Sequence, residues 1–563
     1  MALGPELVFV QADEISREFA RNRVRRASAG DSWMALVFSR DRALLFSWDA
    51  ESYGACRVTP EEIRTLEGAS ASRPPVLDAA RAHIAGSDLC GASQVNRDRV
   101  MDLEFRREIG AGFFQTRHLI FEACGRYSNI IILDEGGAVV EAAKHITPVE
   151  NRYRVVIPGS GYAPPPIIDG VPLDDVCVSG SEELKPDNIR GIGKPLIGAM
   201  KKLPGSDVRA VLSCLKNPVS PCYQILPSGG YVTFAHEPLP GAKVLDSQDA
   251  LSAARAAVVQ PMIGRRVVSC RKKISSLLNA AERANDRKVK EYETLASGYD
   301  EIERLRSEGR LILENAHAIP RRAASATLTE WTDAGPAERK IALDPEKDAS
   351  GNAEARFAKY RRKKSAVESS AAVLPKLYKV RDELREQRVL LECNDDWNSM
   401  SMMLDEFETA NKGGKPRGRQ KGAQGSAAPH KRVEFPEDGA AIFCGLSARG
   451  NRYVTFKLAK ADDLWLHAQD IPGAHVILRF DARPDAGALS RMLGIAASCA
   501  VYYSGGRDAG NIRVDYAERR HVRAIQGEGI ANVTYKEFKT ITADSSLWKD
   551  FESKRGSPGG QAG

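Results

Sequence analysis

Three groups of residues in this chain have types and spacings that suit chemistry or binding, and the densest group lies at residues 462–479. This stretch holds one Trp, two His and three Asp around a Pro-Gly pair, with an apolar run after it. His467, Asp470 and His475 offer imidazole and carboxylate groups of the kind that bind metal ions. We favour instead a hydrogen-bonded polar network that fixes the turn, because no third His and no Cys lies nearby in the sequence. Trp465 suits either a core position or a platform on which a base stacks.

The second group is the pair Asp98 and Arg99, which stands where a predicted strand begins. Met101, Leu103 and Phe105 alternate with charged residues, a pattern typical of a strand with one buried face. From the residues alone, an ordinary ion pair at the start of the strand is the simpler interpretation.

The third group lies at residues 189–196, which resemble a helix-hairpin-helix turn. Gly191 and Gly193 would let backbone amides face outward at a helix N-terminus beside Lys194, an arrangement that suits a phosphate. A plain connection between two helices explains the same residues.

Catalytic signatures are absent from the sequence. It contains no GxSxG, no GxxxxGK, no HExxH and no complete GxGxxG. The ten Cys are scattered singly without a CxxC pair, which fits a reducing cytosol and provides no zinc spacing. We therefore predict a protein that is not an enzyme and that uses no metal and no cofactor.

The elements that position these groups divide into several domains, roughly three to four for a chain of 563 residues. The patterns predict a multidomain α+β protein with a mixed α/β N-terminal domain, a helix-hairpin-helix, a long antiparallel coiled-coil arm and a compact α/β C-terminal domain. The predicted divisions are 1–180 (N-terminal domain), 181–266 (helix-hairpin-helix and a strand that returns to the first domain), 267–410 (arm), 411–432 (basic disordered linker), 433–545 (C-terminal domain) and 546–563 (flexible tail).

The arm is predicted from two runs of apolar residues at three-four spacing, separated by a less regular region at 327–351. The apolar stripe is narrow and the other faces are charged, which favours an extended arm over a helical bundle packed on the body. A 40-residue helix would reach about 60 Å. Pro375 interrupts the second run and is expected to kink that helix.

The net charge of +7 leaves nucleic-acid binding open, because the position of the charge decides it. Residues 411–432 hold seven Lys and Arg and no acid, which suits either a solubilising tether or contacts with phosphates. The N-terminus lacks the pattern of a signal peptide, and no apolar run approaches the roughly 20 residues of a membrane helix. We expect a cytoplasmic protein with no membrane partner.

Longer motifs resemble one family along nearly the whole chain. Residues 463–467 and 470–475 resemble the signature of the C-terminal domain of the NFACT family. These are ribosome quality-control proteins whose bacterial members are RqcH-like and were formerly described as fibronectin-binding-like. Residues 97–100 match the Asp-Arg motif of the family, while 125–131 and 158–166 resemble its N-terminal domain.

This resemblance implies a factor in ribosome quality control. Such proteins bind the large ribosomal subunit after a stalled ribosome has split, while peptidyl-tRNA is still attached. They recruit charged tRNA, here expected to be tRNA-Ala, and direct C-terminal alanine tails without mRNA, which mark the nascent chain for proteolysis. The ribosome performs the peptide-bond chemistry, so the protein positions its partners. The small S4-like RNA-binding protein RqcP is a further expected partner.

The resemblance also assigns roles to residues. Asp98 and Arg99 match the pair that engages tRNA, in which the Arg contacts a phosphate or base edge and the Asp orients it or accepts from a base amine. The other RNA-binding candidates are the signature residues of the C-terminal RNA-binding domain and the helix-hairpin-helix residues: Trp465, His467, Asp470, His475, Gly191, Gly193 and Lys194.

The sequence departs from the family in places that bear on tRNA specificity and tailing. The Asp-Gly that is common near the N-terminus is replaced by the Leu-Gly-Pro-Glu of residues 3–6, and Leu466 and Gln469 stand where an aromatic residue and a Lys are common. The first alternative is therefore an RNA-binding or ribosome-binding factor without tailing. A DNA-processing enzyme is disfavoured by the lack of a Pro-Glu pair at the very N-terminus and of a zinc finger, and a surface adhesin by the lack of a signal peptide.

Overall fold

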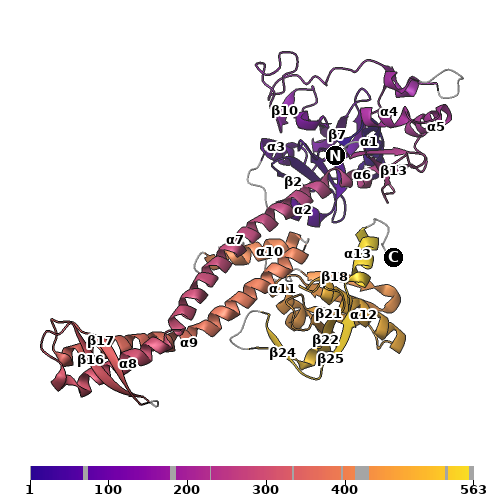
Figure 1. Cartoon of the computed structure of the whole chain (residues 1–563). Helices are drawn as coiled ribbons and strands as arrows, with labels where there is room; N and C mark the ends of the chain where they lie inside the picture. Colours follow the sequence, from indigo (N-terminus) through magenta and orange to yellow (C-terminus); the bar gives the residue numbers. More distant parts are fainter. Residues whose placement is uncertain are drawn as a thin grey trace. The chain divides into compact units, whose positions relative to one another are not determined.

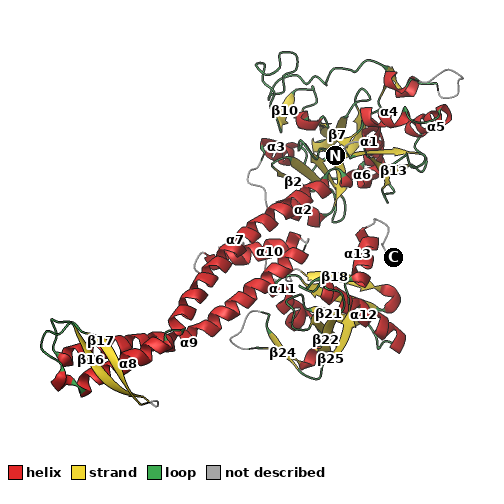
Figure 2. Cartoon of the chain, in the orientation of Figure 1, coloured by secondary structure: helices red, strands yellow, loops and turns green. Residues whose placement is uncertain are grey.

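The computed structural model describes most of the chain (Figure 1), namely residues 2–67, 74–177, 185–227, 230–332, 335–394, 397–411, 430–525 and 531–556. These residues form two compact units, one mainly of Met1–Cys270 and the other mainly of Arg271–Asn394 with Ser399–Trp548. Each unit combines helices with β-sheets, as Figure 2 shows, so the predicted multidomain mixture of helix and strand is confirmed.

The first unit is built on two antiparallel sheets that cover helix α1 (Pro5–Phe19) and share a core with it. The predicted strand after Asp98 is confirmed, since Met101, Leu103 and Phe105 are all fully buried on one face of β7. The four-stranded sheet consists of β2 (Arg26–Gly30), β3 (Trp33–Val37), β4 (Ala43–Ser47) and β5 (Gly54–Val58). The five-stranded sheet consists of β6 (Asp88–Gln94), β7 (Val100–Gly110), β8 (Phe113–Glu122), β9 (Asn129–Leu133) and β10 (Val139–Ala142).

A third sheet closes the first unit with strands from both ends of its sequence. The strand predicted near residue 231 is β14 (Tyr231–Ala235), which pairs in parallel with β1 (Ala2–Leu3) and antiparallel with β13 (Cys222–Leu226). Between these strands in sequence lie the two short helices α4 (Lys194–Met200) and α5 (Gly205–Lys216). Their apolar residues share one core with β1, β13 and β14, so the helix pair is packed onto this sheet.

The second unit begins with an antiparallel arm made of α7 (Val259–Ala296), α8 (Tyr299–Glu314) and α9 (Ala349–Cys393) (Figure 1). The contacts prove the direction. Glu282 pairs with Arg388 at 2.7 Å, Glu293 accepts from the Tyr378 hydroxyl, and Glu301 pairs with Lys363. Residue numbers therefore rise along α7 and α8 while those of their partners in α9 fall. The described helices of this region therefore run antiparallel.

The region between the two long helices of the arm differs from the prediction. The region expected to be less regular contains a hairpin of β16 (Ser325–Thr332) and β17 (Gly335–Ala342), whose core is Leu328 and Ile341 packed on α8. Pro375 lies inside α9 without ending it. Near this proline, Asn285 of α7 donates to the Leu377 carbonyl at 3.1 Å, which attaches a polar side chain to the α9 backbone inside the arm.

A six-stranded sheet forms the C-terminal part of the second unit, in the order β18-β19-β21-β20-β22-β25. Helix α12 (Ala486–Tyr502) packs on this sheet. Residues 453–456 have the residue types of a strand, but they end α11 (Ala448–Tyr453) and enter a π-helical turn, Val454–Leu458. The strands are β18 (His430–Phe435), β19 (Ala440–Gly445), β20 (Leu464–Ala468), β21 (Val476–Phe480), β22 (Ile512–Glu518) and β25 (Lys539–Ala543).

The ends of this part were predicted less well. Residues 546–563 were expected to be flexible, but α13 (Ser546–Gly556) is helical and Trp548 is fully buried, with its amide donating to the Ser498 hydroxyl. Most of the predicted linker, 412–429, and residues 557–563 lie outside the described residues. Within the part of the chain that the structure describes, no helix is both long and apolar enough to cross a membrane.

Candidate functional site

The turn that carries Asp98 has an unusual backbone. Asn96 and Arg97 both adopt left-handed conformations, with φ of 54° and 53°. Two consecutive non-glycine residues in this region are uncommon and mark a turn held by its surroundings. The Asp98 carboxylate accepts from the Arg99 amide at 2.7 Å, and the two side chains approach to 3.7 Å. The simple ion pair that the residues suggest is therefore present but weakly formed.

Gln94 fixes this turn to the N-terminus of α1. Its side-chain amide donates to the Asp98 carbonyl at 2.7 Å and to the Pro5 carbonyl at 2.7 Å. One side chain thus satisfies two backbone groups from segments far apart in the sequence. The position of Asp98 depends on residues that no local pattern connects to it.

The structure brings the Asp98 turn and the helix-hairpin-helix segment together at one pocket of about 350 Å³. Asp98 lines it from one side, and Gly191 and Lys194 line it from the other. Gly191 has φ of 98°, and a Cβ there would lie 3.5 Å from the Arg97 Cβ, so glycine permits both the backbone conformation and the close approach. Two sequence motifs that were predicted separately therefore form a single site.

Gly193 does not play the role predicted for it. Its backbone amide donates to the buried Glu6 carboxylate at 3.0 Å and is unavailable to a phosphate. A Cβ at Gly193 would overlap the Tyr231 hydroxyl oxygen, so this glycine is needed for packing. The expectation that this amide faces outward is wrong, because the buried carboxylate requires it as a donor.

The charges around this pocket are mixed and partly neutralised. Arg97 pairs with Asp174 and stacks on the Phe9 ring, with its guanidinium carbon 3.7 Å from the ring centroid. Lys201 pairs with Asp187 at 2.8 Å. The pocket also receives the exposed Lys194 and the half-buried Arg190, two cations suited to a phosphate.

Arg99 lies apart from that pocket, since it is not one of the described residues that line it. The ionisable residues near Arg99 include Cys124, Tyr53 and Tyr231. The Arg99 side chain is 34% exposed. Nearby Glu122 is buried at the end of β8, where it pairs with Arg154 and accepts from the Tyr162 hydroxyl at 2.8 Å. Burial raises the pKa of Glu122 despite these two partners. Asp98 and Arg99 thus face different surroundings.

The C-terminal signature forms the predicted hairpin, in which β20 and β21 pair antiparallel on either side of Pro472 and Gly473. The His467 and His475 rings lie 5.3 Å apart between centroids, nearly perpendicular to each other. Trp465 is fully buried in the core with Phe443 and Ile477, and its ring stacks on His467 at 5.8 Å. The two His therefore face each other across the turn.

Hydrogen bonds confirm the polar network. His475 Nδ1 and the Thr455 hydroxyl are 2.9 Å apart, and the His475 amide donates to the Asn451 side chain at 2.9 Å. Asn451 in turn donates to the Gly473 carbonyl at 3.1 Å. Asp470 takes no part in these bonds and lies exposed with φ of 54°. Among the described residues, no group of three or more His, Cys, Asp or Glu is placed to hold a metal ion.

Burial keeps both histidines neutral at physiological pH. It lowers the pKa of His467 to about 4, although the Gly473 carbonyl and Asp515 favour the charged form. It also lowers the pKa of His475 well below its ordinary value, and the neighbouring His467 adds to the effect. A neutral imidazole donates from one nitrogen and accepts at the other, so this pair suits hydrogen bonding to neutral groups.

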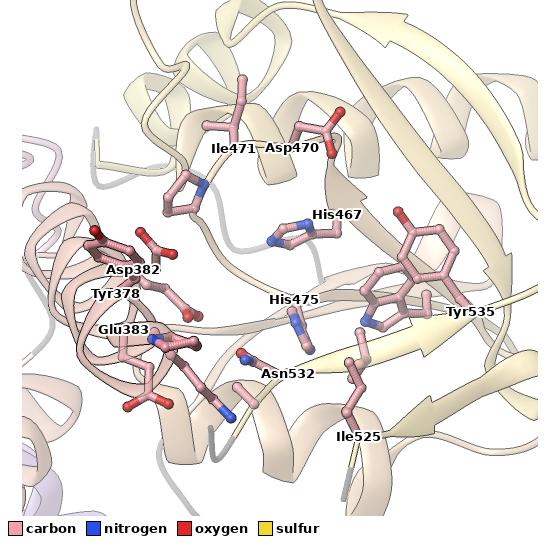
Figure 3. Close-up of a pocket in the computed structure, with 17 residues that line it drawn as sticks. Tyr378, Asp382, Glu383, His467, Asp470, Ile471, His475, Ile525, Asn532 and Tyr535 are labelled. Carbon is pink, nitrogen blue, oxygen red and sulfur yellow. The ribbon is translucent and has the colours of Figure 1, made fainter. Parts of the chain in front are cut away.

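The signature residues line a cavity of about 680 Å³ together with residues of α9 (Figure 3). Asp382, Glu383 and Glu386 come from α9, and Tyr535 comes from β24 (Val533–Tyr535). Sequence reasoning missed these four residues. The only available signal was the acidic cluster 382, 383 and 386 on one face of a helix that is otherwise rich in Lys and Arg.

Comparisons with known proteins identify the family of the chain. The family described as NFACT N-terminal and middle domains matches residues 12–217 and 261–412. A protein named Rqc2 homolog RqcH from Bacillus subtilis (strain 168) is 26% identical over 511 residues, which cover 84% of this chain and 85% of that protein. The protein of the same name from Streptococcus suis (strain 05ZYH33) is 26% identical over 491 residues, covering 82% and 83%.

A solved structure of the C-terminal part of the fibronectin/fibrinogen-binding protein from Streptococcus suis aligns with 51% of this chain and 98% of its own. Its identity is 21% and its TM-score is 0.35, a value too low to support an argument. The family match, by contrast, spans well over half of the 563 residues. The chain therefore belongs to the NFACT family, whose N-terminal and middle domains it carries.

Proposed function

We propose that this chain acts in ribosome quality control by holding tRNA on a split large ribosomal subunit. It would bind the subunit while peptidyl-tRNA is attached and recruit charged tRNA, expected to be tRNA-Ala, so that the ribosome adds C-terminal alanines without mRNA. Relatives that cover most of the chain carry the name Rqc2 homolog RqcH, which supports this class of function.

The observation that carries the proposal is the shared pocket of Asp98, Gly191 and Lys194. A carboxylate that accepts from base amines and a lysine that contacts a phosphate stand at one site, on a turn fixed by Gln94. Arg99 follows Asp98 in the sequence but does not line this pocket, and its side chain is 34% exposed. Such a site binds and positions RNA, and peptide-bond formation is left to the ribosome.

In this proposal the protein is not an enzyme, needs no cofactor, and works in the cytoplasm. The S4-like protein RqcP is the proposed protein partner. The arm of α7, α8 and α9 would extend across the ribosomal surface, and the C-terminal domain would make further contacts with RNA.

One observation favours the alternative of a ribosome-binding factor without tailing. The N-terminal residues 3–6 include Glu6 as an acid, but its carboxylate is buried and accepts from Tyr231, Thr233 and Gly193. A buried carboxylate that is held by three internal donors is not available to tRNA. The contact that an exposed Asp near the N-terminus would make is therefore missing.

Two experiments test the proposal. In sucrose gradients of lysates with stalled ribosomes, the protein is expected in the large-subunit fraction, and its absence from that fraction would contradict the main proposal. In cells that carry a stalled reporter, mass spectrometry of reporter C-termini is expected to show alanine tails. Untailed reporters in wild-type cells, together with co-sedimentation, would favour the alternative.

Variants then connect tailing to the site. The double variant Asp98→Ala/Arg99→Ala is expected to abolish tails while the protein still co-sediments with the subunit. The matched control is Glu104→Ala/Arg106→Ala, an exposed acid and base on the same strand β7 outside the pocket. It is expected to keep full tailing.

A further inference from the structure

The cavity between α9 and the C-terminal sheet, here called the α9 cavity, has two walls of different chemistry (Figure 3). The wall from α9 is mainly acidic: it presents Asp382, Glu383 and Glu386, together with Tyr378 and one cation, Lys379. The opposite wall is aromatic and consists of the Trp465 ring and three rings that contact it, those of His467, His475 and Tyr535. An aromatic face opposite hydrogen-bond acceptors suits a flat group that carries N–H donors.

Polar atoms on both walls lack full hydrogen bonding. On the aromatic wall, the Trp465 indole N–H is buried and has no hydrogen-bond partner among the described residues. On the acidic wall, Glu386 accepts from Asn451 at 3.4 Å, a long contact. Burial raises the pKa of Glu386 to about 7, which shows that its carboxylate lacks compensating donors.

The Trp465 N–H needs an acceptor and the Glu386 carboxylate needs donors, and these two requirements discriminate between classes of ligand. A Lys or Arg side chain would provide donors for the carboxylates but no acceptor for the Trp465 N–H. A phosphate would provide acceptors and would meet Lys379, but it would also meet the charges of three carboxylates, those of Asp382, Glu383 and Asp470. A nucleobase has donors and acceptors on adjacent ring positions and a flat face for the rings.

The two-stranded ribbon of β23 (Val522–Ala524) and β24 gives a second reason to expect a nucleic-acid ligand. Val533 and Tyr535 line the α9 cavity, while Thr534 between them lines a pocket of about 210 Å³ that holds three cations, Arg520, Arg523 and Lys536, and one carboxylate, Glu537. Neither Arg523 nor Lys536 has a carboxylate partner within the described ranges of the chain. The ribbon thus offers aromatic surface on one face and cations suited to phosphates on the other.

We propose that the α9 cavity captures one unstacked nucleobase of a single-stranded RNA and prefers a base that carries an exocyclic amino group. The amino group donates to the acidic wall, led by Glu386, and a ring acceptor receives the Trp465 N–H. Uracil presents a carbonyl in place of the amino group and is disfavoured. The inference rests on the proposed function in so far as RNA is the partner of this domain.

The test compares three short RNA strands that differ at one position. Full-length protein is titrated into fluorescently labelled nine-nucleotide strands that are all uridine, or carry one central cytidine, or carry one central abasic site, and the dissociation constants are measured by anisotropy. The cytidine strand is expected to bind roughly tenfold more tightly than the all-uridine strand, the size expected of one good base contact. The abasic strand is expected to bind no better than the all-uridine strand.

Variants locate the preference in the cavity. Glu386→Gln keeps the shape of the side chain but places an amide N–H₂ at the wall, so the preference for cytidine is expected to disappear or reverse. Asp382→Asn/Glu383→Gln is a second variant for the same wall. Glu354→Gln, at an exposed position of the same helix, is the matched control and is expected to keep the preference. Circular dichroism is used to check that each variant is folded.

Each possible result has a clear meaning. Equal binding of the cytidine and uridine strands by the wild-type protein overturns the inference, as does an unchanged preference in both acidic-wall variants. Tight binding of the abasic strand would show that phosphates alone are recognised, and would also overturn it. The assay contains no ribosome, so protein that prefers cytidine but fails to co-sediment with the large subunit contradicts the proposed function and leaves this inference intact.

Discussion

The backbone amide of Gly193 donates to the Glu6 carboxylate at 3.0 Å, which joins the start of α4 to the start of α1 across 187 residues of sequence. Glu6 also accepts from the hydroxyls of Tyr231 and Thr233 at 2.8 and 2.9 Å. A buried carboxylate is therefore the point where the helix-hairpin-helix segment, the third sheet and the first helix meet. Changes at this junction are expected to affect the stability of the whole first unit.

Gly193→Ala is expected to destabilise the first unit. The new methyl group would overlap the Tyr231 hydroxyl oxygen, so α4 or β14 must shift. Overpacking of this kind costs roughly 1–3 kcal/mol of unfolding free energy. Gly198→Ala in the same helix is the control, because no atom of the described residues lies within 4 Å of the position that its new methyl group would take. Chemical denaturation followed by circular dichroism is expected to show stabilisation of about 0.5–1 kcal/mol for that control.

Glu6→Ala is expected to be among the most damaging single changes in the chain. It leaves two hydroxyls and one amide buried without an acceptor, at a cost on the order of 3–5 kcal/mol. Glu6→Gln keeps one acceptor oxygen and is expected to cost less. The rate of limited proteolysis within residues 185–203 measures whether α4 has detached from the rest of the first unit. Equal resistance of Glu6→Ala and wild-type protein would contradict the structural role.

Glu14 is expected to make stability fall as pH rises. Its buried carboxylate accepts from the amides of Ala250 and Leu251, but burial dominates and raises its pKa to about 7 from an ordinary 4.5. The folded state then holds the proton more tightly than the unfolded state, so the stabilising contribution is complete below pH 4.5 and is lost as pH rises through 7. Over this window the loss is about 3 kcal/mol.

Glu14→Gln removes that titration and provides the measurement. The unfolding free energy of wild-type protein minus that of Glu14→Gln is expected to decrease as pH rises from about 4.5 to about 7.5, measured by urea denaturation at each pH. Other buried acids contribute equally to both proteins and cancel in the difference. The exposed Glu108→Gln serves as the control and is expected to give a difference that does not change with pH.

Thr455→Val is expected to destabilise the C-terminal domain by roughly 1–3 kcal/mol, because His475 Nδ1 would be left buried without its 2.9 Å partner. The substitution preserves the shape of the side chain. Thr542→Val, at an exposed position of β25, is the control and is expected to be nearly neutral. Differential scanning calorimetry of both variants separates the two outcomes.

Local sequence patterns predicted strands from two signals, the alternation of apolar and polar residues and the turns that flank apolar runs. The strands around Trp33 and Phe46, the strand from Met101 to Phe105, and the hairpin around Pro472 all follow from period-two alternation or turn chemistry. The Val454–Leu458 turn has the β-branched and aromatic residues of a strand but forms a π-helical segment, because it packs as the continuation of α11.

The candidate sites could be predicted only in part, because their walls come from distant segments. Asp98 was identified from its motif, but its proximity to Gly191 and Lys194 depends on how α4 packs against the sheet. The role of Gly193 was misjudged, since nothing in its neighbourhood indicates that a carboxylate 187 residues away needs its amide. Likewise, no local pattern places Glu386 beside Asn451.

The parallel pairing of Ala2 with Tyr231 and of Leu3 with Val232 limits how early the first unit can finish folding while the chain is being synthesised. Strand β1 has no partner until β14 has left the ribosome, so the first unit cannot be completed while fewer than about 230 residues are exposed. Until then the apolar side of α1 lacks part of its covering, and a chain that stops early would expose it. A factor proposed to act on stalled chains would therefore itself depend on uninterrupted translation through β14.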